Sequence, residues 1–256
     1  MKGFAYETHL HTKEGSACSS CPASTYVPLF KNLGYAGIIV TDHFFNGNCT
    51  VPHWLCWEEK VNQFFLGYEK AKKLGDEIGL QVFFGWESTN RFDDYLVYGL
   101  DKTWLLGHPQ VVDWSPSQIF EATDAEGGCV VHAHPFREQF FITEIKLYPE
   151  CIHAVEVSNG ANEIDFDRRA LSYAQAFDFP MTSGSDLHHG QYVAMQKRGV
   201  VFEKKWESIQ DYCQAIRERK PYSLITTEER YFPLSYKTSS VPITMYGRNN
   251  EILFQG

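Results

Sequence analysis

The sequence has no long hydrophobic run and no excess of basic residues. No segment of about 18 consecutive apolar residues occurs, and the N-terminus lacks the basic-then-apolar pattern of a signal peptide, so we expect a cytoplasmic protein. Asp and Glu outnumber Lys and Arg by 32 to 23, which gives a formal net charge of -9. This balance disfavours binding to a membrane surface or to extended nucleic acid, because both are anionic.

Disulfides and several common catalytic motifs are also missing. The chain has seven cysteines, an odd number, and no secretory signal, so free thiols are expected. Cys18 and Cys21 form a CxxC pair, but no second CxxC completes a zinc site. The sequence has no glycine-rich phosphate loop, no nucleophile elbow and no Ser-His-Asp order, so it does not indicate an activated serine nucleophile.

Segments that suit strands alternate with segments of helical spacing along the whole chain. The clearest helix start is Ser115-Pro116-Ser117-Gln118, which has a Ser cap, Pro at the first helical position and Gln three residues after the cap. We expect strands at residues 4–8, 36–41, 81–86, 95–99, 129–133, 154–157, 181–183, 198–202 and 222–226, and helices at residues 21–33, 61–78, from 115 onward, 165–177 and 206–217.

This alternation predicts an α/β fold whose parallel sheet closes, or nearly closes, into a barrel. No linker, repeat or low-complexity tract divides the chain, so we expect one domain over residues 1–250. Residues 253–256 resemble a viral-protease cleavage site used to remove affinity tags, and we interpret residues 251–256 as a tag remnant.

The first strand ends in His9-Leu10-His11. Residues two apart in an extended chain project to the same face, so the two imidazoles would lie side by side. Neutral imidazole is the commonest metal ligand in proteins, although paired histidines are also frequent on polar surfaces.

Further imidazoles and carboxylates follow later strands. The carboxyl ends of the strands of a barrel meet at one pocket, so these side chains would converge there. Such a set suits two or three divalent ions, with a shared carboxylate bridging a pair. The residues concerned are His43, Glu87, His132, His134, Asp186 and His188.

Together these motifs resemble those of the PHP family (polymerase and histidinol phosphatase domain). The match lies between residues 7 and 189 and consists, in order, of HLH, TDH, GWE, AHPFR and GSDLH. The resemblance implies a distorted TIM-like (β/α)7 barrel with a metal cluster at the carboxyl ends of the strands. It also implies phosphoesterase activity.

The resemblance further implies ligands for three ions: His9, His11 and Asp186 for the first, Glu87 as a bridge between the first and second, His134 for the second, and His43 and His188 for the third. The family usually has an acid or His shortly after the first motif, and the nearest candidate in this chain is Glu14. The family often has a His after the bridging Glu, and this chain has Asp94 there. Both are expected to be ligands, and such oxygen donors favour Mn or Fe over an all-zinc site.

Several neighbouring residues have supporting or alternative roles. His132 shares the strand face of His134, but the family pattern favours His134, and Pro135 should hold His134 in an extended backbone. Glu7 is expected to orient an imidazole, and Asp42 to be structural. Arg137 could clamp a phosphate, or could be an ordinary surface arginine.

The predicted function is hydrolysis of a small phosphomonoester by metal-activated hydroxide, as in a histidinol-phosphatase-like enzyme or a nucleotide or sugar phosphatase. Glu87, Asp186 and Arg137 are the predicted catalytic residues, with Mn, Fe or Zn as cofactor. The alternatives are a phosphodiesterase or exonuclease acting on small nucleotides, a hydrolase of other C–N or C–O bonds, and a non-catalytic metal-binding module. The sequence identifies neither the substrate nor the oligomeric state.

Overall fold

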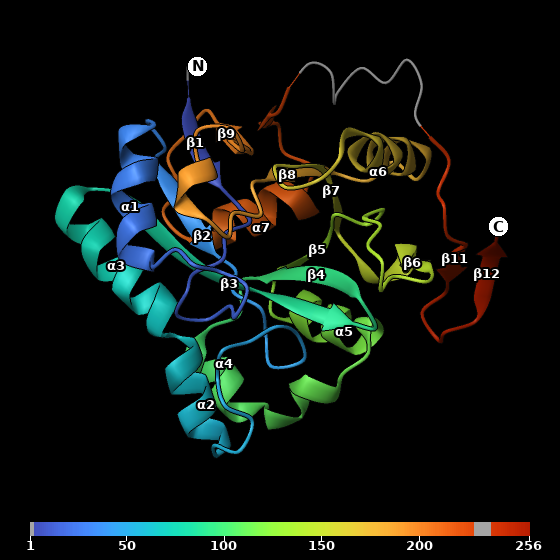
Figure 1. Cartoon of the computed structure of the whole chain (residues 1–256), viewed down its shortest axis with the longest axis horizontal. Coiled ribbons are helices and arrows are strands. Elements are labelled where there is room, and N and C mark those ends of the chain that lie inside the picture. The colour runs from blue at the N-terminus through green and yellow to red at the C-terminus, as the bar shows by residue number, and fades with distance from the viewer. Residues whose placement is uncertain (1–2, 228–236) are drawn as a thin grey trace.

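A nine-stranded sheet forms the centre of the protein, with helices packed around it (Figure 1). The computed structural model describes residues 3–227 and 237–256. The strand order is β10-β9-β1-β2-β3-β4-β5-β7-β8. The strands are β1 (Phe4–Glu7), β2 (Gly37–Val40), β3 (Gln81–Asn90), β4 (Asp93–Tyr98), β5 (Cys129–Ala133), β7 (Ala154–Asn159), β8 (Met181–Gly184), β9 (Gly199–Phe202) and β10 (Ser223–Ile225).

The sheet nearly closes where the chain continues beyond β1 and β8. Leu10 and Leu187 form a parallel bridge there. The Asp186 amide donates to the His9 carbonyl at 2.9 Å, and the His11 amide donates to the Leu187 carbonyl at 3.1 Å. At the other end of β1, β9 pairs antiparallel with Phe4–Tyr6. The predicted barrel is therefore confirmed, in a distorted form.

The expectation of a purely parallel sheet is wrong. The strand β4 runs antiparallel to both β3 and β5, and β9 runs antiparallel to β1 and β10. Only Arg91 and Phe92 separate β3 from β4, at φ values of 51° and 76°. A two-residue turn with positive φ at both positions matches the twist of a β-hairpin, and a hairpin makes its strands antiparallel.

The helices are α1 (Ala23–Asn32), α2 (Trp57–Phe64), α3 (Leu66–Ile78), α4 (Lys102–Gly107), α5 (Pro116–Ala125), α6 (Ile164–Ala176) and α7 (Ile209–Arg217), with 3₁₀ turns at Pro109–Asp113, Pro149–Cys151 and Gly190–Tyr192. The single helix expected over residues 61–78 is divided at Phe65. Just after this division, Gly67 packs so closely on Thr12 and Asp42 that a Cβ would collide with both side chains. Within the part of the chain that the structure describes, none of the helices combines the length and the apolarity of a membrane span.

A separate three-stranded sheet has the order β12-β11-β6 (Figure 1). Its strands are β6 (Ile145–Leu147), β11 (Ile243–Tyr246) and β12 (Ile252–Gln255), with β11 parallel to β6 and antiparallel to β12. The sequence analysis did not predict β6 or β11. Most of the residues interpreted as a tag remnant form β12, all four residues of which are exposed.

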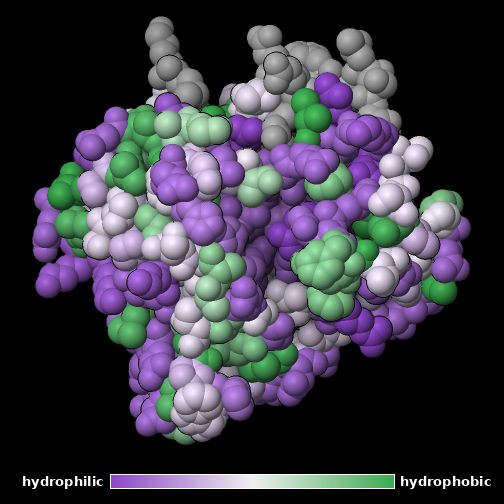
Figure 2. Space-filling model, in the orientation of Figure 1, coloured by the Kyte–Doolittle hydropathy of each residue, from purple (hydrophilic) through white to green (hydrophobic). Residues whose placement is uncertain are grey.

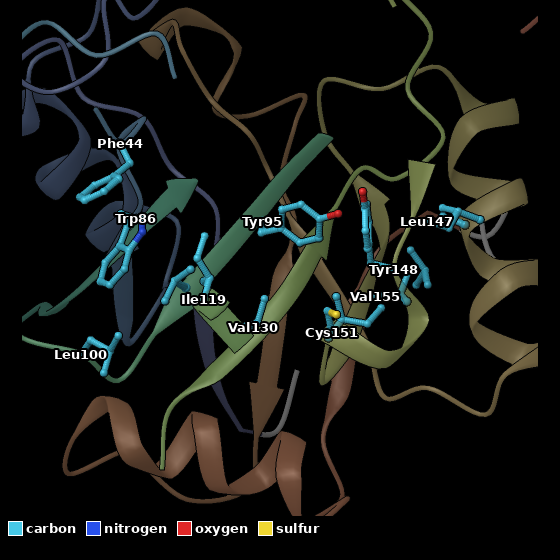
Figure 3. Packing of buried hydrophobic residues seen from close by; sticks show 14 of the residues in the cluster. Phe44, Trp86, Tyr95, Leu100, Ile119, Val130, Leu147, Tyr148, Cys151 and Val155 are labelled. Atoms are coloured by element: carbon cyan, nitrogen blue, oxygen red, sulfur yellow. The ribbon is translucent and has the colours of Figure 1, made fainter. Parts of the chain in front are cut away.

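Aromatic packing joins the segment that follows β2 to the middle of β3. Figure 3 shows Phe44 lying against Trp86, and their ring centroids are 5.4 Å apart. Both side chains are fully buried. Phe44 directly follows His43 and Trp86 directly precedes Glu87, so this contact sets the positions of two predicted ligands. The Phe44 amide also donates to the Glu87 carbonyl at 2.8 Å.

The predicted helix start at Ser115 is present, and its cap can be tested. Ser115 Oγ accepts from the Gln118 amide at 3.3 Å, and Gln118 Oε1 accepts from the Ser115 amide at 3.0 Å. We expect Ser115→Ala to lower the free energy of unfolding by about 1 kcal/mol, measured by urea denaturation, because the cap hydrogen bond is lost. Ser117→Ala, two residues further on, removes a half-buried hydroxyl that takes no part in the cap, and should change it by less than about 0.5 kcal/mol. Equal effects of the two substitutions would contradict the cap.

Candidate metal centre

Seven of the nine predicted ligands come together at the carboxyl ends of the strands. They form three groups, and within each group the donor atoms lie within 4.8 Å of one another. The first group is His9, Glu87 and His134, the second is His9, His11 and Asp186, and the third is His11, His43 and His188. The shared members, His9 and His11, join the three groups into one continuous cluster. Five of the seven side chains are fully or almost fully buried, and His43 and His188 are partly exposed.

Hydrogen bonds behind the cluster fix the ring nitrogens of His9 and His11. His9 Nδ1 lies 3.0 Å from Glu156 Oε1, so this nitrogen carries the proton and donates. His11 Nδ1 lies 3.0 Å from Ser16 Oγ, which itself donates to Asp42 Oδ1 at 2.8 Å, so His11 Nδ1 is also the donor. With Nδ1 held in this way, Nε2 of each ring is the atom that can bind a metal. Burial would lower the pKa of His9, but Glu156, Asp186 and Glu87 outweigh it and raise this pKa well above its usual value.

The two Nε2 atoms face each other and two carboxylates. His9 Nε2 and His11 Nε2 are 3.1 Å apart. Asp186 Oδ1 lies 3.4 Å from the first and 3.2 Å from the second. Two imidazole nitrogens and a carboxylate oxygen thus converge in a buried space. Once any protons they share are displaced, these atoms can coordinate one cation, so the donor set fits a divalent metal.

The Glu87 carboxylate spans two of the groups. Its Oε1 lies 3.1 Å from His134 Nε2 and 3.3 Å from His9 Nε2. Its Oε2 lies 2.7 Å from His43 Nδ1, yet neither of these two atoms has a partner with hydrogen-bond geometry. A carboxylate placed in this way can bridge two ions, as predicted for Glu87.

Two cluster residues have a left-handed backbone. His134 has a φ of 30° and Asp186 a φ of 52°. The expectation that Pro135 holds His134 in an extended conformation is therefore wrong. Positive φ is unfavourable for residues with a Cβ and is found mainly where the surrounding structure enforces it, often at functional sites. Here it turns both side chains from their strand ends into the cluster.

The charges of the cluster depend on one another. Burial would raise the pKa of Glu87, but His43, His9 and His11 hold it well below its usual value. Burial would likewise raise the pKa of Asp186, and His9 and His11 similarly lower it. Burial and the neighbouring His188 and His43 lower the pKa of His11. Ionised carboxylates beside a neutral imidazole are the protonation states that bind metals.

Asp42 supports the cluster from behind, as predicted. It accepts from both the amide and the hydroxyl of Thr12, each at 2.6 Å, and from Ser16. These contacts fix the loop that follows His11. The prediction for Glu7 is wrong in detail, because its Oε1 accepts from the backbone amides of His9 and Ser185 and not from an imidazole.

Glu156, in β7, has the role expected of Glu7, and the sequence analysis did not identify it. Besides contacting His9, its Oε2 accepts from the His134 amide at 3.0 Å and from Asn159 Nδ2 at 2.9 Å. The side chain is fully buried. The signal available in the sequence was an acid between two valines of a buried strand, where a charged side chain requires a partner.

Cys18 is a second residue that was not identified. Burial raises the pKa of its thiol, but hydrogen bonds with His188 and His43 outweigh this effect and lower the pKa to about 6. Cys18 is exposed and is in none of the three ligand groups, but these two imidazoles belong to the third group. Cys21, the other half of the CxxC pair, is buried against α1, so the two thiols do not form one site.

The structure does not bring Glu14 to the cluster. Its Oε2 accepts from the Ala23 amide at 3.1 Å, and its Oε1 lies 3.3 Å from Lys70 Nζ. A carboxylate at the first turn of α1 is stabilised by the free amides and the dipole of the helix, and this explains its position.

Three further predicted residues lie at the edge of the ligand cluster or outside it: Asp94, Arg137 and His132. Asp94 Oδ2 is 3.9 Å from His134 Nε2 and 3.2 Å from the Arg137 guanidinium. Arg137 is thus positioned beside the cluster, with about a quarter of its side chain exposed. His132 stacks on Tyr95 with ring centroids 4.8 Å apart, and burial lowers its pKa to about 3. His132 is in none of the three ligand groups.

Comparison with known proteins bears on the fold. No family model matches the chain, and no curated protein matches it. Among solved structures, it is similar to a two-domain Bacteroides vulgatus protein described as containing a predicted PHP-like metal-dependent phosphoesterase, with 15% identity over 88% of this chain and a TM-score of 0.60. The chain covers 65% of that protein.

Two further solved structures share the fold. One is a Bifidobacterium adolescentis protein described as a metal-dependent phosphoesterase, with 17% identity, a TM-score of 0.52, and coverage of 83% of this chain and 96% of that protein. The other is a lesion-specific endonuclease from Pyrococcus furiosus, with 13% identity, a TM-score of 0.55, and coverage of 86% and 57%. The chain therefore has the barrel fold of PHP-like proteins.

The contact between His9 and Glu156 predicts an effect on metal binding. We expect Glu156→Gln to weaken the binding of Mn²⁺ by about 10- to 100-fold, measured by isothermal titration calorimetry, because the amide cannot hold the His9 ring as the carboxylate does. Glu126→Gln, at an exposed position after α5, should bind as the wild type does. Unchanged affinity in Glu156→Gln, with its fold intact by circular dichroism, would contradict this role.

Proposed function

We propose that the protein is a metal-dependent phosphoesterase that hydrolyses small phosphomonoesters. The observation that carries the proposal is the convergence of the Nε2 atoms of His9 and His11 with the buried carboxylates of Glu87 and Asp186. Divalent ions bound there would supply Lewis acidity and acidified water near neutral pH. The likeness in fold to proteins described as phosphoesterases supports the same conclusion.

The three groups of donors suggest three positions for ions. His9, His11 and Asp186 would hold the first, Glu87 would bridge it to the second beside His134, and His43 and His188 would hold the third. We assign Cys18 to this third position, in place of Glu14, because hydrogen bonds with His188 and His43 lower the pKa of its thiol. Asp94, which lies near His134, would be a ligand at the outer side of the second ion position. Imidazole and carboxylate ligands suit Mn, Fe or Zn, and a thiolate favours Zn or Fe at the third.

Arg137 would bind the phosphate. Its guanidinium contacts Asp94, and its Nε has no hydrogen-bond partner among the described residues. A planar guanidinium can donate two parallel hydrogen bonds to a phosphate and so orient it toward the cluster. This role also offsets the negative charge that develops on the phosphate oxygens during the reaction.

A phosphodiester in nucleic acid is the second candidate substrate. The likeness to the Pyrococcus furiosus endonuclease favours it. Against it stand the net charge of -9 and the chain's coverage of only 57% of that endonuclease. Because extended nucleic acid is bound mainly through its phosphates by Lys and Arg, we place this candidate second.

The proposal can be tested with p-nitrophenyl phosphate and isosteric variants. We expect Asp186→Asn and Glu87→Gln to lower the turnover of this ester at least about 100-fold, because each removes a charged ligand without changing its size. Chelation should abolish turnover, and added Mn²⁺, Fe²⁺ or Zn²⁺ should restore it. Wild-type turnover in either variant would refute the mechanism.

The same assay distinguishes the candidate substrates. Faster cleavage of bis(p-nitrophenyl) phosphate or of duplex DNA than of the monoester would favour the second candidate. Metal binding without cleavage of any of these esters would indicate a non-catalytic module.

The assignment of Cys18 predicts a change in metal content. We expect Cys18→Ala to lose about one equivalent of zinc per chain after dialysis, measured by elemental analysis, because the third position loses one ligand. Cys56→Ala, at an exposed position before α2, should retain the wild-type content. Equal metal content in the two variants would place Cys18 outside the centre.

A further inference from the structure

Three phenylalanines form an exposed group, here called the aromatic rim, consisting of Phe92, Phe140 and Phe141. Phe92 is 57% exposed, Phe140 98% and Phe141 41%. The ring centroids of Phe92 and Phe141 are 5.6 Å apart, and those of Phe140 and Phe141 are 5.2 Å apart. Neighbouring exposed rings of this kind mark binding sites more often than isolated apolar residues do.

The aromatic rim borders the candidate metal centre. Phe92 lines the same small cavity as Asp94, His134 and Arg137. It lies two residues before Asp94 on the β3–β4 hairpin, a span of roughly 7 Å in extended chain. Phe140 follows Arg137 by three residues. Figure 2 shows an apolar patch at the edge of a hydrophilic hollow in the middle of this face.

The backbone that carries Phe140 and Phe141 is held on both sides. Glu138, before them, pairs with Arg169 of α6 and accepts from the Ser240 amide at 3.2 Å. Ile142, after them, is buried, and β6 then pairs with β11. The rings are thus presented to solvent by an anchored segment. An anchored aromatic ring loses little conformational freedom when it binds a ligand.

The arrangement of charge and apolar surface indicates the shape of the ligand. Arg137 lines the same cavity as Phe92, Asp94 and His134, and its buried Nε has no hydrogen-bond partner among the described residues. A phosphate bound at Arg137 and the cluster would place whatever group it carries toward the three rings. Three side chains provide too little area for a stable protein interface, but enough for one flat ring.

We propose that the aromatic rim stacks a planar ring of the substrate, which is therefore a phosphomonoester of an aryl or nucleoside group. This inference rests on the proposed phosphoesterase function and adds a substrate class to it. Aryl esters and nucleotides share the required chemistry, namely a flat π-system joined to a phosphate by a short link. Stacking on aromatic side chains tolerates many rings, because every such ring has a π-face.

The test compares substrates with and without a ring in the wild type and in the double variant Phe140→Ala/Phe141→Ala. The pairs are phenyl phosphate with glycerol phosphate, and adenosine monophosphate with ribose 5-phosphate. We expect the wild type to prefer the ring-bearing member of at least one pair, and the variant to lose about tenfold or more in kcat/KM for that member alone. Preference within the first pair identifies an aryl group, and preference within the second a nucleobase.

Trp54→Ala provides the matched control, because Trp54 is an exposed aromatic residue, 74% accessible, that packs beside His53 in the loop after β2. It should leave both members of each pair unchanged. Phe140→Ala alone, at the most exposed of the three positions, should produce part of the loss without affecting the fold. Equal losses for ring-bearing and ring-free substrates, or no loss, would overturn the aromatic rim as a binding surface.

A binding measurement separates this inference from the proposed activity. Phenylphosphonate and methylphosphonate are not hydrolysed, and their affinities for the metal-loaded protein can be measured by calorimetry. Tighter binding of phenylphosphonate, lost in the double variant, supports the aromatic rim even if no ester is cleaved. Equal binding of the two phosphonates, together with measurable phosphatase activity, would overturn the aromatic rim and leave the proposed function intact.

Discussion

The pair formed by His9 and Glu156 is the interaction on which the centre depends. The carboxylate accepts from Nδ1 of the imidazole and thereby directs Nε2 toward His11, Glu87 and Asp186. The same carboxylate accepts from the His134 amide, where the backbone has its unusual φ of 30°. The buried Glu156 side chain thus orients the imidazole of His9 and also fixes the backbone of His134.

The hydrogen bonds that close the barrel also hold the ligands of the centre together. The hydrogen bonds that join the extensions of β1 and β8 involve the His9 carbonyl, the His11 amide and the Asp186 amide. Gly184 makes this approach close, because a Cβ there would collide with His9 and Glu156. A barrel that opened at this seam would separate the first two histidines from Asp186. The position of the ligands is therefore a property of the whole sheet.

The sequence predicts the ligands better than it predicts their supports. His9 and Asp186 are found because each follows a strand, and strand ends meet in a barrel. Glu87 and Glu156 both lie within strands, β3 and β7. Glu87 is found because it follows the strand expected at residues 81–86, whereas only the burial of Glu156, a tertiary property, reveals its role. Glu14 and Cys18 occupy one loop, and spacing alone does not decide which of them turns inward. In the structure Glu14 accepts from the Ala23 amide at the start of α1, whereas Cys18 is exposed and has its pKa lowered by His188 and His43.

The same limit applies to the fold. The apolar runs of β2 and β5 predict buried strands, but the direction of β4 depends on the two-residue turn at Arg91 and Phe92. That turn also places Phe92 beside the centre and Asp94 at its rim. Reversing one strand thus brings an acid and an aromatic ring to the same edge of the site. A strand returning through a helical connection would begin at the opposite end of the barrel, away from the cluster.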